Sequence, residues 1–271
     1  MSFERIPNFT QLRKDKDGYD KRFTIDTEHP LFNDPLVDPR ESDFGFTDAS
    51  SYYSQPNRMT GKVLPGVPDA PLVRLDVAKR LQRAEEYLRT DPEVRDALGA
   101  PARLKISDAL RPYAVQKFAF EVAWPQIIRE QNPELSEEEL LAQVPKYCAR
   151  PADSPTPTPH LTGGAVDVSL VNVETDEHFD RGHVAGKVQG TAFPDFHEGT
   201  IQSMAKVISK TPRKSGCCTR TKPDCIRPEN LIFFMHVLAG LENRSNEIWH
   251  YGKGDPLSEY VAGISNHSYY G

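Results

Sequence analysis

The chain has 271 residues, a formal net charge of −6 and 27% charged residues. A length of this order holds one large domain or two small ones, so a sizeable core is expected. The negative balance offers no basic stripe for a phosphate backbone, which argues against nucleic acid as a partner and favours a small substrate.

The first 71 residues are rich in proline, aspartate, serine and aromatic residues and show little helical periodicity. We expect an ordered but irregular arm with short strands, for example at Lys62-Val63-Leu64, because the aromatic side chains need a core in which to bury. The predicted organisation is one domain over residues 1–271, in which the arm (1–71) packs on a core of residues 72–252.

Several elements follow in the core. Apolar residues recur at helical spacing over 76–89, which predicts an amphipathic helix. The alternation over 103–107 predicts a strand. A second helix is expected over 114–123, where Pro125 kinks or ends it. Ser136, three residues before a glutamate, fits a capping box and predicts a third helix.

Prolines recur between 151 and 159 and predict a stiff loop that delivers His160. In the next segment, 165–171, valines and a leucine alternate with Asp167, which predicts a strand with Asp167 on the face opposite the core. Later helices are expected over 201–208 and 231–241. We expect an α+β fold with an antiparallel sheet, helices packed on one side and the site in a cleft on the open face.

Four side chains form a candidate metal site. His160, Asp167 and His250 offer two imidazoles and one carboxylate, a set that catalytic zinc sites use with the fourth position left to water. Two glycines between His160 and Asp167 allow a tight turn that brings them together. Glu247 remains as a base. Residues three apart face opposite sides of an ideal strand, so the segment from Glu247 to His250 must bend, bulge or lie at a strand end.

Four segments in this order carry a family resemblance: Ser107 to Pro112, His160 to Asp167, Gly190 to Phe196, and Glu247-x-Trp249-His250. Together they resemble the signature of the zinc D-alanyl-D-alanine dipeptidases and their relatives, the D,D-carboxypeptidases and the hedgehog-type fold. The match spans roughly residues 100 to 252. The chain departs from the pattern at Ile248, where a second tryptophan is usual.

The resemblance implies that His160, Asp167 and His250 bind one zinc ion per chain, that Glu247 is the general base and that Arg111 stabilises the transition state. It implies an antiparallel sheet with packed helices of the hedgehog or D-Ala-D-Ala peptidase type. The implied activity is hydrolysis of D-Ala-D-Ala, a small dipeptide linked to the bacterial cell wall. A D,D-carboxypeptidase or peptidoglycan endopeptidase of the same superfamily is the near alternative.

Two other classes of protein use similar residues. Non-haem iron oxygenases also bind metal through two histidines and a carboxylate. The 2-oxoglutarate-dependent ones resemble each other in a tight His-x-Asp pair and a later arginine, whereas here seven residues separate His160 from Asp167 and no arginine follows His250. A non-catalytic, zinc-stabilised binding module is the other alternative, and Glu247 argues against it because a structural site needs no spare base.

The remaining candidates have simpler explanations. His178 and His183 lie in an expected surface loop without a matching distant pair. The residues Asp195, His197 and Glu198 are expected near the pocket as supporting or surface groups, and Cys217, Cys218 and Cys225 as free thiols or one disulfide.

No apolar run of about 18 residues occurs, and the amino terminus lacks the apolar segment of a secretory signal. We therefore expect no membrane contact and a cytoplasmic location, with a periplasmic or secreted one open if an export signal has been removed. The oligomeric state is not predicted.

Overall fold

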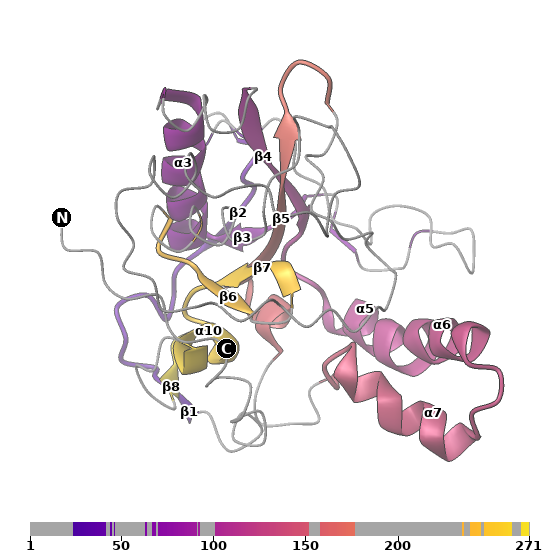
Figure 1. Ribbon diagram of the computed structural model, residues 1–271. Helices are drawn as coiled ribbons and strands as arrows, with labels where there is room; N and C mark the ends of the chain where they lie inside the picture. The colour runs from indigo at the N-terminus through magenta and orange to yellow at the C-terminus, as the bar shows by residue number, and fades with distance from the viewer. Residues whose placement is uncertain are drawn as a thin grey trace, which may run out of the picture.

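The computed structural model describes residues 24–41, 44, 46, 63, 67–68, 70–90, 92, 101–151, 158–176, 235, 239–244, 247–261 and 267–270. These residues combine helices with mainly antiparallel sheets, in agreement with the expected α+β class (Figure 1). The central sheet has four antiparallel strands in the order β4-β5-β7-β6. They comprise Ala102–Asp108 (β4), Ala165–Asn172 (β5), Glu247–Gly252 (β7) and Glu242–Arg244 (β6).

The edge strand β4 follows the predicted alternation. Its residues at even positions are buried, whereas Arg103, Lys105 and Ser107 are partly exposed. Between Ile106 and Asp108 the pairing with β5 shifts by one residue, so that Ser107 is an extra residue on β4. Such a bulge bends a strand and redirects the chain that follows. It lies directly before the segment that approaches the site.

The helix predicted over 76–89 is confirmed as α3 (Leu75–Thr90). It lies beside β4, and the two elements contact each other (Figure 1). One face of α3 is buried and belongs to the main hydrophobic core, which also receives residues of β4, β5 and β7. The buried residues of α3 are Val77, Ala78, Leu81, Ala84 and Leu88, at the spacing that places side chains on one helical face.

A helical segment follows β4 and lies to one side of the sheet, at the lower right of Figure 1. It consists of α5 (Tyr113–Phe118), a π-helical turn (Ala119–Ala123) and α6 (Trp124–Gln131). The helix expected over 114–123 is present as α5 and the π-helical turn, but Pro125 does not end the helical path, which continues to Gln131. Pro125 falls in the first turn of α6, directly after the π-helical turn. A first-turn position tolerates the missing N–H, so the proline does not interrupt the path.

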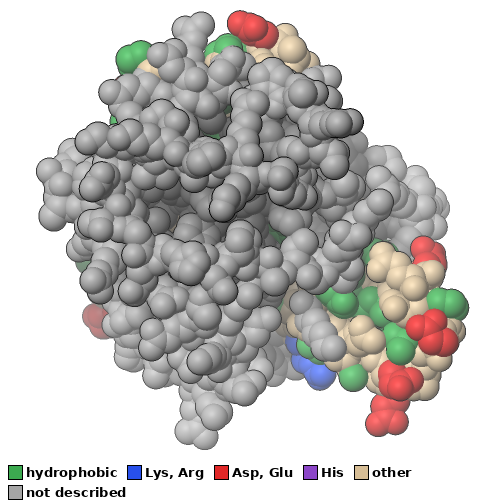
Figure 2. All heavy atoms as spheres, viewed as in Figure 1, with side chains coloured by type: hydrophobic (Ala, Val, Ile, Leu, Met, Phe, Trp, Pro, Cys, Tyr) green, Lys and Arg blue, Asp and Glu red, His purple; other side chains and the backbone are tan. Residues whose placement is uncertain are grey.

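The third helix is confirmed as α7 (Glu137–Gln143), and a short 3-10 turn (Val144–Lys146) follows it. The Ser136 hydroxyl accepts from the Glu139 amide at 3.3 Å, and the Glu139 carboxylate accepts from the Ser136 amide at 2.9 Å. This is the predicted capping box. The glutamates of the first turn suit the positive end of a helix, and Figure 2 shows acidic side chains exposed over this segment.

Both ends of the described chain pack together. Strand β1 (Thr24–Ile25) pairs with β8 (His267–Ser268), and β2 (Leu36–Val37) pairs with β3 (Val73–Arg74). Between β7 and β8 lies the short helix α10 (Pro256–Val261). The Tyr270 ring is buried, and its hydroxyl donates to Asp34 Oδ2 at 3.0 Å. The last residues are thus part of the core.

The strand predicted at 165–171 is confirmed as β5. The site was expected on an open face of the sheet, but along β5 both faces are largely buried. Val166, Val168 and Leu170 belong to the main core as expected. Ser169, which alternates with them, is fully buried as well. The central strand of a covered sheet is buried on both faces, so Asp167 projects into a largely enclosed region.

Other predictions fall on residues outside the described part of the chain: most of the 62–64 strand, the loop at 152–157, the helix at 201–208, most of the helix at 231–241, both surface histidines, the loop at 190–198 and the three clustered cysteines. Among the described residues, no helix has the length and apolar character needed to cross a membrane.

Candidate metal centre

Three elements deliver the three predicted ligands to one point. His160 lies on a short 3-10 turn (Pro159–Thr162, η4), Asp167 on β5 and His250 on β7. Asp167 and His250 are directly opposite each other in the antiparallel pairing of these strands. Opposite residues of such a pair hold their Cβ atoms about 5 Å apart, which suits two ligands of one ion.

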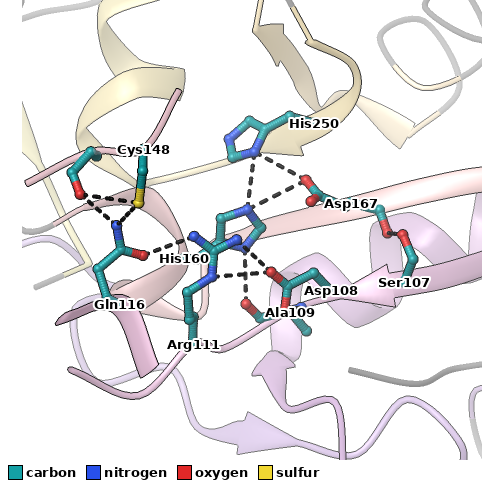
Figure 3. A network of polar contacts seen from close by, with 10 residues as sticks. Ser107, Asp108, Ala109, Arg111, Gln116, Cys148, His160, Asp167 and His250 are labelled. Carbon is teal, nitrogen blue, oxygen red and sulfur yellow. Dashed lines mark hydrogen bonds and ion pairs between the residues drawn. The ribbon is translucent and has the colours of Figure 1, made fainter. Parts of the chain in front are cut away.

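The ligand atoms form a nearly equilateral triangle (Figure 3). His160 Nε2 lies 3.1 Å from His250 Nδ1 and 3.3 Å from Asp167 Oδ1, and His250 Nδ1 lies 3.2 Å from the same oxygen. Zinc holds nitrogen and oxygen ligands at about 2.0–2.2 Å, and tetrahedral angles then separate them by about 3.3–3.5 Å. The triangle therefore has nearly the size of one face of a zinc tetrahedron.

The His160 ring is oriented by the main chain. Its Nδ1 lies 2.9 Å from the carbonyl oxygen of Ala109. A carbonyl oxygen only accepts, so Nδ1 carries the hydrogen and the neutral ring keeps its lone pair on Nε2. Metal-binding histidines are held in this way by a partner on the second nitrogen. The ring thus points its available lone pair at Asp167 and His250.

The turn between His160 and Asp167 requires two glycines. Gly163 has φ +71°, a left-handed conformation that glycine adopts without strain. A Cβ on Gly164 would lie 2.7 Å from the Lys253 carbonyl oxygen and 2.7 Å from Tyr270 Cδ2. The Thr162 hydroxyl accepts from the Gly164 amide at 2.9 Å. The predicted tight turn is confirmed, and close packing against the end of β7 leaves it little room to move.

The electrostatics of the site favour a positive charge at its centre. At His160, burial is the largest influence and lowers the pKa, and the Arg111 guanidinium lowers it further. The carboxylates of Asp167 and Asp108 outweigh both, so the pKa of His160 lies above its ordinary value. Burial would raise the pKa of Asp167, but the imidazoles of His160 and His250 hold it well below its ordinary value. A divalent cation can supply the same positive charge in place of a proton.

Arg111 lies next to this centre, after the bulged end of β4. Its backbone amide donates to the carbonyl oxygen of His160 at 3.0 Å, which ties the two main chains together. Its guanidinium donates to Asp108 Oδ2 from Nη2 at 2.5 Å and from Nε at 3.1 Å. From Nη1 it donates to Gln116 Oε1 at 2.8 Å. Figure 3 shows the contacts that hold the guanidinium.

Glu247 is the first residue of β7, and its side chain lies outside the described part of the structure. Because Glu247 and His250 are three residues apart, the strand between them was expected to bend, bulge or lie at a strand end. The backbone meets this expectation. Asn243 pairs with Tyr251, whereas the next residue of β6, Arg244, pairs with Glu247. The pairing thus skips the residues between Glu247 and Tyr251, so the strand is irregular there as predicted.

Three supporting groups were not predicted from the sequence. They are the Ala109 carbonyl, the carboxylate of Asp108 and the amide of Gln116, which contact His160 or Arg111. A signal existed for Asp108, which lies within the Ser107 to Pro112 segment that carries the family resemblance. Gln116 lies outside that segment and carried no comparable signal.

The chain is similar to a distant relative among known proteins. No family model matches the chain. A D-alanyl-D-alanine dipeptidase of Synechocystis sp. is 26% identical over 194 residues, which cover 69% of this chain and 70% of that protein. At this identity the match supports a distant relationship to that hydrolase.

Proposed function

We propose that this protein is a zinc-dependent dipeptidase that hydrolyses D-Ala-D-Ala. The observation that carries the proposal is the triangle of ligand atoms from His160, Asp167 and His250, with sides of 3.1–3.3 Å. The distant similarity to a D-alanyl-D-alanine dipeptidase supports the substrate. We further propose a hedgehog-type peptidase fold and a single domain over residues 1–271, with 1–71 as an arm on the catalytic core of 72–252.

The chemistry of the ligand set fits zinc, since imidazole nitrogen and carboxylate oxygen are ligands it prefers and three protein ligands leave one position for water or substrate. His160 would bind through Nε2, His250 through Nδ1 and Asp167 through Oδ1, the atoms that face one another. Bound zinc supplies the Lewis acidity that activates water and polarises a peptide carbonyl. Burial of both imidazoles keeps competing solvent from these ligands.

Glu247 is the proposed general base. One of its carboxylate oxygens takes the proton of the attacking water and afterwards returns it to the departing amine. A carboxylate in this role must lie within hydrogen-bond reach of the water. Its position three residues before His250, on an irregular part of β7, is compatible with that demand.

Arg111 is the proposed stabiliser of the negative charge that develops on the carbonyl oxygen. A guanidinium is charged at every relevant pH and donates in a fixed plane. Asp108 and Gln116 hold that plane at both ends, so little reorganisation is needed when the charge develops.

A substrate comparison tests the proposal. The purified protein with zinc is assayed on free D-Ala-D-Ala and on a muropeptide that ends in D-Ala-D-Ala. We expect faster release of D-alanine from the free dipeptide. Preference for the muropeptide would instead assign a D,D-carboxypeptidase or endopeptidase. Bound iron in place of zinc, with no hydrolysis of either, would favour an oxygenase.

A further inference from the structure

We propose that Gln116 is a positioning residue, which acts on the reaction by fixing the guanidinium of Arg111. The inference rests on the proposed function, since it assigns a partner to the residue expected to stabilise the transition state. Gln116 lies on α5, and only 1% of it is exposed. A buried amide must satisfy its hydrogen bonds within the protein.

Both ends of the Gln116 amide are in use. Its Oε1 accepts from Arg111 Nη1 at 2.8 Å. Its Nε2 donates to the carbonyl oxygen of Ala149 at 2.6 Å and to Cys148 Sγ at 3.3 Å. The orientation of the amide is settled by its partners, because a guanidinium only donates and a carbonyl oxygen only accepts. Gln116 thus connects Arg111 to the chain that follows α7.

Asp108 holds the opposite side of the same guanidinium. It accepts from Nε and Nη2, whereas Gln116 accepts from Nη1 (Figure 3). Contacts at all three nitrogens define both the position and the plane of the group. With Asp108 alone, the guanidinium can still tilt about the side that the carboxylate holds. Gln116 removes that freedom.

Asp108 also connects Arg111 to the metal centre, through hydrogen bonds in which Gln116 takes no part. Asp108 Oδ1 accepts from the Ala109 amide at 3.0 Å, and the Ala109 carbonyl accepts from the ring of His160. Among the residues that the structure describes, the partners of the Gln116 side chain are Arg111, Cys148 and Ala149, and none of these is a proposed metal ligand. Removing the amide should therefore disturb Arg111 while leaving the affinity for zinc unchanged.

The first measurement is a comparison of Gln116→Met with the wild type. Methionine has a similar length and no amide, so it removes all three hydrogen bonds of the Gln116 amide with little change in volume. We expect kcat to fall about 10- to 100-fold, as misplacement of a positioned group by about 1 Å can produce. The zinc content should stay at one per chain. Gln126→Met is the matched control, since Gln126 is exposed on α6, and it should leave kcat within about 2-fold of the wild type.

A double-mutant cycle decides whether Gln116 acts through Arg111. In the Arg111→Ala background the target of Gln116 is absent, so Gln116→Met should change kcat by less than about 3-fold. An equal loss in both backgrounds would overturn the proposal and leave Gln116 a purely structural residue. If the methionine variant does not fold, Gln116→Asn takes its place, since its amide is one methylene shorter and no longer reaches Arg111.

A measurement without substrate separates this proposal from the proposed function. In the wild type, the Arg111 side-chain nitrogen signals should be resolved and slowly exchanging in ¹⁵N NMR, with the assignment made from Arg111→Lys. In Gln116→Met they should average and exchange faster. Unchanged signals would overturn the positioning role. If the wild type cleaved no peptide while these signals changed as expected, the proposed function would fail and the role of Gln116 in holding Arg111 would stand.

Discussion

Asp167 and His250 face each other across β5 and β7, with 3.2 Å between Oδ1 and Nδ1. The pairing of two strands thus sets the separation of two ligands, and the turn at η4 adds His160 as the third. Ligands held by sheet and turn are prepositioned, so little ordering is required when a metal binds.

Asp167→Asn should therefore weaken zinc binding sharply. The substitution keeps the shape of the side chain and removes the negative charge, which both stabilises the cation and orients the two imidazoles. We expect the affinity to fall by more than about 100-fold, beyond the usual effect of a residue that only supports a ligand. Competition with a chromophoric chelator measures this. Asp176→Asn is the control, because Asp176 is exposed and pairs with Arg103. Equal affinities of the two variants would contradict the assignment of Asp167.

Glu247→Gln should separate turnover from metal binding. If Glu247 transfers the proton, its loss should lower kcat by about 100- to 10,000-fold while zinc stays bound. Turnover and zinc content are measured on the same preparation. Glu174→Gln serves as a control, since Glu174 is exposed on the turn after β5. A Glu247→Gln protein that turned over normally would show that the base is another group.

Tyr270→Phe should destabilise the fold. The Tyr270 hydroxyl donates to Asp34 Oδ2, which also accepts from the Asp76 amide at 2.8 Å. Removing one donor from a buried carboxylate should cost about 1–3 kcal/mol of unfolding free energy. Chemical denaturation measures the change. Tyr113→Phe is the matched control, because the Tyr113 side chain is exposed, and a similar cost at both sites would contradict the assigned role.

Glu85 should make stability depend on pH. Burial raises the pKa of Glu85 and outweighs the Leu104 amide and the nearby arginines, which lower it. A raised pKa in the folded state means that the protonated form is favoured by folding. Its contribution to stability is therefore fully present below the ordinary carboxyl pKa of about 4.3 and is lost as pH rises through the raised value.

Glu85→Gln mimics the protonated carboxyl, and its amide oxygen can still accept from the Leu104 amide. Relative to this variant, the wild type should lose stability as pH rises from about 4.5 into the range above the raised pKa. Denaturant unfolding of both proteins at several pH values measures the difference. A difference that did not change with pH would show that burial does not perturb Glu85.

Local rules account for what could be predicted from the sequence. The alternation in β5 and the glycine turn place His160 beside Asp167 over a short stretch of chain, where spacing is informative. The meeting of Asp167 with His250 depends on the pairing of strands some eighty residues apart, which spacing alone does not specify. There the motif resemblance supplied the expectation.

The groups that hold the site could not be predicted in the same way. The Ala109 carbonyl, which follows the bulge at Ser107, contacts His160, and a main-chain carbonyl has no sequence signal of its own. Gln116 lies on α5, just after Arg111 in the chain, but its amide also contacts Cys148 of a later segment. Such contacts follow from the tertiary path of the chain.

The central claim is tested most directly by zinc titration of the metal-free protein during hydrolysis of D-Ala-D-Ala, beside L-Ala-L-Ala. We expect D-alanine release to rise in proportion to zinc, to saturate at one ion per chain and not to extend to the L-peptide. Full zinc binding without cleavage of D-Ala-D-Ala, or cleavage that is independent of zinc, would contradict it.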